Sequence, residues 1–325
     1  MTVLYFQKPT DVWLELLRQV AAQFPAVDFH YGTEAESRLI ARAEVIICSK
    51  PSRSLIEQAQ ALRLLLVPIS GITHLPLDLL HRRGVRVGNT HGNAAVVAER
   101  AMAMILAFYG RIIEFHHDLR HERWHGFWSG QGLDDTWESI FHKRVSILGA
   151  GAIGCSLARL LVPFGCRVTG FKRTPPDRTP EGFERVVTDL DEAIDGAEIV
   201  VIALPATAQT ERLIDGARIE AMGRALLVNV GRGSIVDEQA LFDACRNGTL
   251  RGAAIDTWYT YPEHGTVGPP SRFPIHQLDN VVLSPHIAGY TRHSALRCTE
   301  ETVENLRRYL KDGTLLHEAD PATAY

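Results

Sequence analysis

The sequence predicts an α/β protein with two doubly wound domains, each built on a parallel sheet. Short apolar runs alternate with helical stretches almost from end to end, which is typical of parallel strands covered by helices on both faces. The alternation restarts at residue 144, and 325 residues exceed the size of one ordinary hydrophobic core. We therefore expect a first domain made of residues 1–97 and 291–325, with a second domain, 98–290, inserted into it.

The first domain is expected to have a flavodoxin-like pattern of strands and helices. Its strands are predicted at VLYF (3–6), VDFHY (27–31), EVIIC (44–48), RLLLVPI (63–69) and VRVGN (85–89). Helical stretches such as 13–24 and 75–84 lie between them. The closing stretch 291–313 has the apolar spacing of a helix and stops at Gly313, and we expect it to pack on the first domain.

The second domain is expected to contain six strands, the number in a complete Rossmann dinucleotide-binding domain. They are predicted at RVSILG (144–149), CRVTGF (166–171), EIVVIAL (198–204), ALLVNV (225–230), RGAAID (251–256) and NVVLS (280–284). One apolar helix over 93–120 is expected between the two halves, and the stretches 129–137 and 263–274 are predicted loops. In such a sheet, ligands bind beyond the carboxyl ends of the strands.

Composition and charge narrow the possible partners. A net charge of −4 argues against nucleic acid or an anionic membrane surface as a partner. The long apolar stretch 95–110 contains Glu99 and Arg100, so it is a poor membrane span. Five scattered cysteines without a CxxC pair, and no secretory leader at the N-terminus, favour a reduced cytoplasm. No cysteine, histidine and carboxylate cluster has metal-ligand spacing, so we expect no metal.

The segment RVSILGAGAIG places Gly149, Gly151 and Gly154 after a predicted strand and at the start of a helix. The first glycine permits a tight turn, the second lets the backbone approach a pyrophosphate, and the third allows close contact between helix and strand. The helix N-terminus adds partial positive charge. Because the surrounding strand–helix–strand pattern is also present, the segment predicts a dinucleotide-binding site.

The end of the next strand predicts which dinucleotide is bound. An NAD site usually has an acidic residue there to bind the ribose 2′-hydroxyl, but this chain has Lys172, Arg173 and Thr174. Two cations and a hydroxyl would hold a 2′-phosphate, whereas a carboxylate would repel it. We expect NADP(H) to be preferred and NAD(H) to remain possible; the alternative is a solvated basic loop end.

Three charged or titratable residues follow predicted strands of the second domain. Arg232 follows the fourth strand, Asp256 ends the fifth and His286 follows the sixth, after Pro285. An arginine can hold the carboxylate and carbonyl of a 2-oxo acid, and a histidine can give a proton to the carbonyl oxygen as hydride reaches the carbon. These residues therefore predict reduction of a small 2-oxo acid.

The ordered motifs resemble those of the NAD(P)-dependent D-2-hydroxyacid dehydrogenases, the family that includes glyoxylate/hydroxypyruvate reductases, phosphoglycerate dehydrogenases and formate dehydrogenase. The resemblance covers about residues 44–312. It rests on SGITHLPLDLLHRRGVRVGNT, VVAERAMAMILA, ILGAGAIG, NVGRGSIVDE, AAIDTW and LSPHIAG, in the family's order. It implies two domains with the active site between them, usually in a homodimer, with substrate binding on Arg232, the acid/base role on His286, and Asp256 facing the nicotinamide carboxamide.

The resemblance also implies further site residues. Substrate would bind in the first domain at Ser70, at the backbone amides of Gly71 and Ile72, and at Asn93, although Asn93 equally suits an ordinary helix cap. The remaining cofactor contacts implied are Ala152, Ile153, Leu204, Pro205, Thr210, Val230, Gly231, Ala288 and Gly289.

One position departs from the family pattern. Counting from Asp256, Tyr261 stands where the family has a glutamate that binds the catalytic histidine, and Glu263 falls after Pro262. A carboxylate stabilises imidazolium, whereas a neutral phenol supplies no full charge, so we expect His286 to lose its proton at lower pH than in relatives with glutamate. Tyr261 is a candidate catalytic residue, and the alternative is a purely packing role.

Two other functions fit the same motifs. Formate dehydrogenase resembles this chain at the segment DTWY, has a neutral residue in place of the glutamate, and transfers hydride without proton transfer. The C-terminal-binding corepressors use the same architecture to sense a dinucleotide without turnover. The basic pair at 172–173 favours a reducing role, and Arg232 with His286 favours an enzyme.

Overall fold

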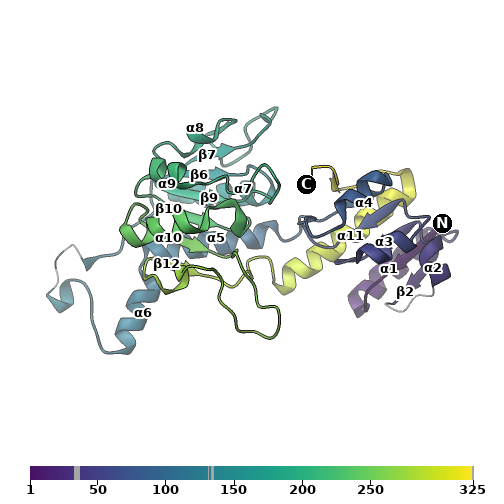
Figure 1. Ribbon diagram of the computed structural model, residues 1–325, viewed down its shortest axis with the longest axis horizontal. Helices are drawn as coiled ribbons and strands as arrows, with labels where there is room; N and C mark the ends of the chain where they lie inside the picture. The colour runs from purple at the N-terminus through teal and green to yellow at the C-terminus, as the bar shows by residue number, and fades with distance from the viewer. Residues whose placement is uncertain (33–36, 131, 133–134, 324–325) are drawn as a thin grey trace. The chain divides into compact units, whose positions relative to one another are not determined.

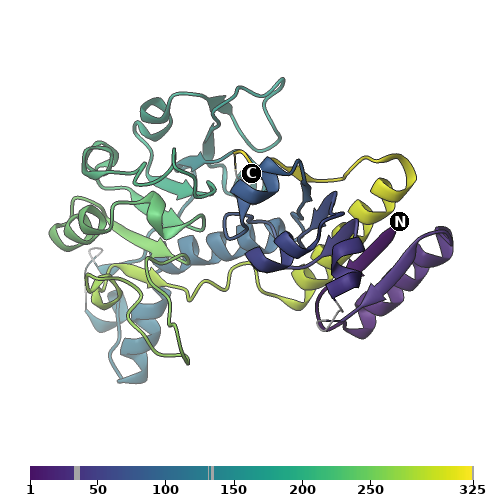
Figure 2. The ribbon, with the colours of Figure 1, turned by 45° about the vertical axis from the view of Figure 1, so that its right-hand side comes forward.

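The computed structural model describes residues 1–32, 37–130, 132 and 135–323. The chain divides into two compact units, which Figures 1 and 2 show from two sides. Unit 1 consists of Met1–Asn93 and Tyr290–Tyr325, and unit 2 of Ala94–Gly289. The sequence analysis put these boundaries at 97/98 and 290/291. No helix among the described residues has the length and apolar character needed to span a bilayer.

Unit 1 contains a six-stranded sheet in the order β2-β1-β3-β4-β5-β13. Its first five strands are parallel and follow the order 2-1-3-4-5 of a flavodoxin-like sheet. The sixth strand is antiparallel to β5 and was not expected, because only two residues form it. The strands are β1 (Thr2–Tyr5), β2 (Asp28–Tyr31), β3 (Val45–Ile47), β4 (Leu64–Leu66), β5 (Arg86–Gly88) and β13 (Glu318–Ala319).

Helices cover both faces of this sheet. They are α1 (Asp11–Gln23), α2 (Ser37–Arg42), α3 (Arg53–Gln58), α4 (Leu77–Arg82) and α11 (Arg292–Asp312). The last helix lies beside α1, and its Val303 and Leu306 share a core with Trp13 and Leu17. Unit 1 is therefore completed by the C-terminal part of the chain.

Unit 2 contains a seven-stranded parallel sheet in the order β8-β7-β6-β9-β10-β11-β12. From its first strand this is the 3-2-1-4-5-6 order of a Rossmann domain with one strand added. The prediction of two parallel α/β sheets is thus confirmed, although β8, with three residues, was missed. The strands are β6 (Arg144–Leu148), β7 (Arg167–Phe171), β8 (Arg185–Val187), β9 (Ile199–Ile202), β10 (Leu226–Asn229), β11 (Gly252–Ile255) and β12 (Val281–Leu283).

Helices pack on both faces of this sheet as well. They are α5 (Ala94–Tyr109), α7 (Ala152–Leu161), α8 (Leu190–Ile194), α9 (Gly216–Met222) and α10 (Glu238–Asn247). A further helix, α6 (Ile112–Arg120), follows α5 and has no buried residue. The single helix expected over 93–120 is wrong, because the chain breaks at Gly110 and Arg111. Arg111 has a left-handed φ of 49°, and a side chain at Gly110 would meet the carbonyl oxygen of Leu106. In Figure 1, α6 projects from the unit as a separate element.

Candidate active site

The glycine turn between β6 and α7 has the geometry expected of a dinucleotide site. Gly149 has a φ of 112°, which a side chain would strain. A Cβ on Gly151 would meet no heavy atom within 4 Å, whereas one on Gly154 would lie 2.1 Å from the Gly149 carbonyl oxygen. Gly151 also begins α7, whose first residues are Ala152 and Ile153. The turn thus leaves open space in front of a helix N-terminus, which suits a bound pyrophosphate.

The basic pair lies directly beyond β7. Lys172 and Arg173 are both exposed, and Thr174 beside them is exposed too. The guanidinium of Arg173 donates a hydrogen bond of 2.6 Å to the side-chain oxygen of Gln209, in the loop after β9. This bond holds the guanidinium of Arg173 near the end of β7, where an NAD site usually has an acidic residue.

The other residues implied as cofactor contacts follow neighbouring strands of the same sheet. The hydroxyl of Thr210 donates to the carbonyl oxygen of Pro205, so the loop after β9 is closed on itself. Gly231 lies so near this loop that a Cβ would be 2.7 Å from the Leu204 carbonyl oxygen. Val230, before it, is buried, as is Ala288 in the loop after β12, which Gly289 follows.

Arg232, Tyr261 and His286 line one cavity of about 700 Å³ in unit 2. They come from the loops after β10, β11 and β12, which end side by side because these strands are parallel neighbours. Trp258 and Tyr259 also line the cavity, so both belong to its wall. The three residues that the sequence assigned to catalysis are therefore brought together.

The turn that carries Arg232 is fixed by the side chain of Asn229 at the end of β10. Asn229 accepts from the backbone amide of Gly231 and donates to the carbonyl oxygen of Arg232. One guanidinium nitrogen of Arg232 donates to the carbonyl oxygen of Gly231 at 2.7 Å. These bonds leave most of the fork of Arg232 donors for a ligand in the cavity.

Tyr261 lies beside the histidine ring without a recorded hydrogen bond to it. The two ring centroids are 5.4 Å apart at an interplanar angle of 45°. Instead, the phenol oxygen accepts a bond of 3.0 Å from the backbone amide of Trp258. Burial raises the pKa of Tyr261, while that amide and Arg232 act in the opposite direction. The phenol is therefore a neutral group whose own proton can be donated, and the residue is 49% exposed.

His286 has an unusual backbone and a depressed pKa. Its φ is 55°, in the left-handed region that few non-glycine residues adopt. Partial burial lowers the pKa of the imidazole below its usual value, and the positive charge of Arg232 lowers it further, whereas Asp256 acts in the raising direction. Within the described part of unit 2, no carboxylate is hydrogen-bonded to this ring, in keeping with tyrosine at position 261.

Asp256 binds the loop that carries His286. Its side chain is buried and accepts three hydrogen bonds, from the hydroxyl of Ser284 and from the backbone amides of Ile287 and Ala288. Asp256 is only 1% exposed. The contact with a nicotinamide carboxamide implied for this residue stays a prediction.

In unit 1, the residues implied in substrate binding form one local cluster. The hydroxyl of Ser70 donates to the side-chain oxygen of Asn93 at 2.5 Å, and Asn89 donates to the carbonyl oxygen of Ser70. Asn93 thus binds the loop after β4. Among the described residues, the backbone amides of Gly71 and Ile72 donate to no acceptor; Gly71 is partly exposed, whereas Ile72 is only 1% exposed.

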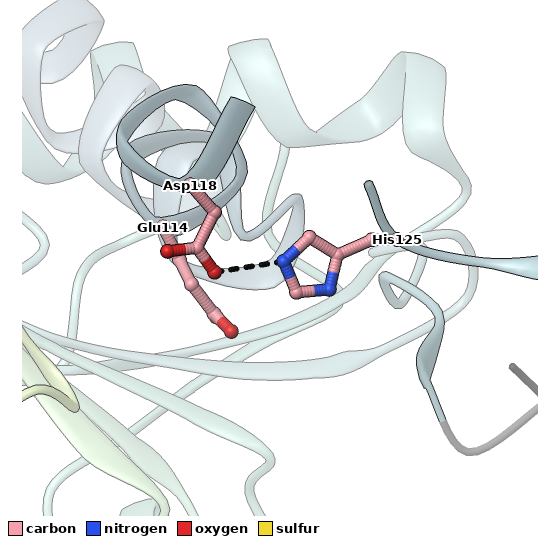
Figure 3. A group of neighbouring side chains, drawn as sticks. All are labelled: Glu114, Asp118 and His125. Carbon is pink, nitrogen blue, oxygen red and sulfur yellow. Dashed lines mark hydrogen bonds and ion pairs between the residues drawn. The ribbon is translucent and has the colours of Figure 1, made fainter. Parts of the chain in front are cut away.

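One group of side chains in unit 2 has the proximity of metal ligands. Ligand atoms of Glu114, Asp118 and His125 lie within 4.8 Å of one another, as Figure 3 shows. However, both ring nitrogens of His125 already bind carboxylates, Asp118 at 2.8 Å and Asp135 at 2.9 Å. Bonds to both carboxylates raise the pKa of His125. The group is therefore accounted for as an ion-pair cluster around a protonated histidine.

The sequence analysis missed two residues near this site. Ser284 had a sequence signal, since it is a polar residue at the end of a predicted strand, two positions before His286. Arg100 also had one, as a charged residue within the apolar motif VVAERAMAMILA on α5; its guanidinium donates to the hydroxyl of Ser284 at 3.2 Å.

Comparison with known proteins identifies the family. Residues 102–288 match the family model described as D-isomer specific 2-hydroxyacid dehydrogenase, NAD binding domain. Glyoxylate/hydroxypyruvate reductase B of Erwinia tasmaniensis is 32% identical over 272 residues, which cover 82% of this chain and 81% of that protein. The mitochondrial formate dehydrogenase of Solanum tuberosum is also 32% identical, over 79% of this chain and 66% of that protein.

A solved structure agrees with these relatives. The 2-hydroxyacid dehydrogenase of Ketogulonicigenium vulgare Y25 superposes with a TM-score of 0.74 at 26% identity, covering 100% of this chain and 99% of that one. This similarity extends through both units, beyond the part matched by the family model. The chain belongs to the D-isomer specific 2-hydroxyacid dehydrogenase family and is an NAD(P)-dependent oxidoreductase.

Proposed function

We propose that this enzyme reduces small 2-oxo acids to D-2-hydroxy acids with NADPH. The observation that carries the proposal is the cavity in unit 2 on which Arg232, Tyr261 and His286 meet at the carboxyl ends of parallel strands. An arginine fork and a titratable imidazole on one wall are the groups that a 2-oxo acid requires.

In this proposal Arg232 holds the carboxylate and the carbonyl oxygen of the substrate and stabilises the negative charge that develops on that oxygen. His286, in its protonated form, delivers a proton to the same oxygen. Bound NADPH supplies the hydride. The free amides of Gly71 and Ile72, with Ser70 and Asn93 beside them, form a carboxylate-binding loop in unit 1.

Tyr261 has a defined role in the same proposal. Since its oxygen accepts from the Trp258 amide, the phenol proton is directed away from that amide and is available to a substrate oxygen. Tyr261 thus helps to bind the substrate, and His286 works without a carboxylate at its ring. The family resemblance supports this division of roles, because the tyrosine occupies the position of the usual glutamate.

The open space at the glycine turn supports binding of a dinucleotide, and the basic pair supports NADP(H), which carries a 2′-phosphate. The open space at Gly151 admits a pyrophosphate, with Ala152 and Ile153 presenting backbone amides. Lys172 and Arg173 then bind the 2′-phosphate. NAD(H) would lack these two charge-assisted contacts.

A screen of substrates tests the function. We expect purified protein to oxidise NADPH with at least one of glyoxylate, hydroxypyruvate, pyruvate and phenylpyruvate, measured at 340 nm, and to leave formate unoxidised. A clear formate signal with inactive 2-oxo acids would refute the proposal.

Formate oxidation is the second candidate because of one observation. The neutral Tyr261, bound to a backbone amide, leaves His286 without a charged partner at its ring, which suits a reaction that passes hydride without moving a proton. The similarity to a formate dehydrogenase points the same way. A third reading, a dinucleotide sensor, would show tight NADPH binding and no turnover with any acid in the screen.

We also propose that the enzyme is a cytoplasmic homodimer. The described part of unit 2 exposes apolar side chains on and after α6, which we name the α6 patch: Ile112, Ile113, Leu119, Trp124 and Trp137, each more than half exposed. Apolar side chains gathered in this way are typical of an interface with another protein. All five cysteines are free, in keeping with a reducing compartment.

A further inference from the structure

A chain of hydrogen bonds runs from α5 to the loop that carries His286. The guanidinium of Arg100 donates to the hydroxyl oxygen of Ser284 at 3.2 Å, and that hydroxyl donates its proton to a carboxylate oxygen of Asp256 at 2.5 Å. The direction is fixed, because arginine can only donate and a carboxylate can only accept. Arg100 thereby orients the Ser284 proton toward Asp256.

The same carboxylate holds the backbone that follows the histidine. Asp256 accepts from the amide of Ile287 at 3.0 Å and from the amide of Ala288 at 3.2 Å. On the other side of the histidine, the indole of Trp258 donates to the carbonyl oxygen of Ser284 at 2.8 Å. The loop is thus bound before and after His286, while the imidazole itself remains on the cavity wall.

Such binding is what the backbone of His286 requires. A residue other than glycine in the left-handed region is unfavourable and persists only where its surroundings fix it. Ser284 and Asp256 are 2% and 1% exposed, so the ligand of the cavity meets little of either side chain. Their influence on the reaction therefore passes through the loop.

We propose that Arg100, Ser284 and Asp256 act as positioning residues, forming a hydrogen-bonded chain that holds His286 in its left-handed conformation. This inference rests on the proposed role of His286 as the proton donor. It gives Arg100, a residue on α5 to which the sequence assigned no role, a part in the reaction.

The variant Ser284→Ala tests the chain, with Ser146→Ala as its matched control. Ser146 is also a buried serine of unit 2, on β6, and its hydroxyl has no hydrogen-bond partner among the described residues. We expect Ser284→Ala to lower kcat roughly 10- to 100-fold, the range typical of a misplaced catalytic group, with the Kd for NADPH changed less than about twofold. Ser146→Ala should leave both values near those of the wild type.

A second pair of variants tests Arg100, the first donor of the hydrogen-bonded chain. Arg100→Lys retains a donor and should recover part of the kcat that Arg100→Met loses, with substrate KM and NADPH Kd alike in the two variants. Wild-type kcat in Ser284→Ala, or equal kcat in Arg100→Lys and Arg100→Met, would overturn the inference. A loss of NADPH binding in parallel with kcat would also overturn it, because the chain would then serve the cofactor.

Failure of the proposed function is distinguishable from failure of this inference. If the wild type reduces no 2-oxo acid, the proposed function fails, and the position of His286 is then read from crystal structures of the wild type and of Ser284→Ala. A variant loop that leaves the left-handed region supports the hydrogen-bonded chain, and an unchanged φ at His286 refutes it.

Discussion

At the scale of single residues, the surroundings of His286 determine how it titrates. The pKa of His286 is lowered by partial burial and by Arg232, and the tyrosine adds no compensating charge. Imidazolium is the acid form, so reduction should be fastest below this pKa and should decline as the pH rises through it.

Tyr261→Glu should move that decline to higher pH. A carboxylate near the ring stabilises imidazolium and raises the pKa of His286, by on the order of one unit or more for such pairs. The measurement is kcat/KM for the 2-oxo acid against pH. Tyr261→Phe is the control, since it removes the hydroxyl without adding charge and should keep the wild-type midpoint. A midpoint that is the same in all three proteins would mean that the tyrosine only packs.

The second prediction at the scale of single residues concerns the basic pair Lys172 and Arg173. The double variant Lys172→Ala with Arg173→Ala should lower kcat/KM for NADPH roughly 10²- to 10⁴-fold, because each of the two charge-assisted bonds to a phosphate contributes about 1.5–3 kcal/mol. The value for NADH should change little. Arg178→Ala, an exposed arginine in the same loop, is the control. Equal losses with both cofactors would contradict the assignment of a 2′-phosphate site.

At the scale of elements, two glycines of the turn after β6 should differ in what a substitution affects. A side chain at Gly151 should affect NADPH binding, and one at Gly154 should affect the stability of the fold. Gly151→Ala places a methyl group in open space, so the melting temperature should stay near that of the wild type while the Kd for NADPH rises. Gly154→Ala drives a Cβ against the Gly149 carbonyl oxygen and should lower the free energy of unfolding by roughly 1–3 kcal/mol. Thermal unfolding and a fluorescence titration of NADPH check the pair. A stable Gly154→Ala protein would show that α7 can shift away from the turn.

The same scale shows what the sequence could and could not predict. Strands of four or five mostly apolar residues, such as β6 and β9, stood out from the pattern, and so did the turn after β6. By contrast, β8 has only three residues, Arg185–Val187, and two valines are too short an apolar run to stand out as a strand. The break between α5 and α6 was missed because residues on both sides are apolar, and only the backbone at Gly110 and Arg111 reveals it.

Some site residues could also be predicted from the sequence, whereas the interactions of others could not. Arg232 and His286 were predictable because each follows a strand of a parallel sheet, where side chains from distant motifs converge. The bonds of Asp256 were not predictable, since a carboxylate at a strand end can face either a ligand or a neighbouring loop. The bond from Arg100 to Ser284 could only be found from coordinates, because the two residues are 184 positions apart along the chain.

At the scale of the whole molecule, the α6 patch predicts self-association. Leu119→Glu places a charge on an apolar side chain that is 51% exposed, and it should shift a dimer toward monomer in sedimentation velocity. Leu296→Glu, on α11 and 43% exposed, is the matched control and should sediment as the wild type does. A wild-type monomer at micromolar concentration would refute the homodimer.

Unit 1 is assembled from two distant segments of the chain, and this has a consequence during synthesis on the ribosome. Unit 2 is contiguous, so it can fold as soon as it has emerged. Trp13 and Leu17 are synthesised before unit 2, but the core that they share with Val303 and Leu306 is complete only after α11 has been synthesised. The segment Met1–Asn93 is therefore translated before unit 2 but protected from proteases only after α11, and a nascent chain halted before α11 leaves this segment open to cleavage while unit 2 is folded.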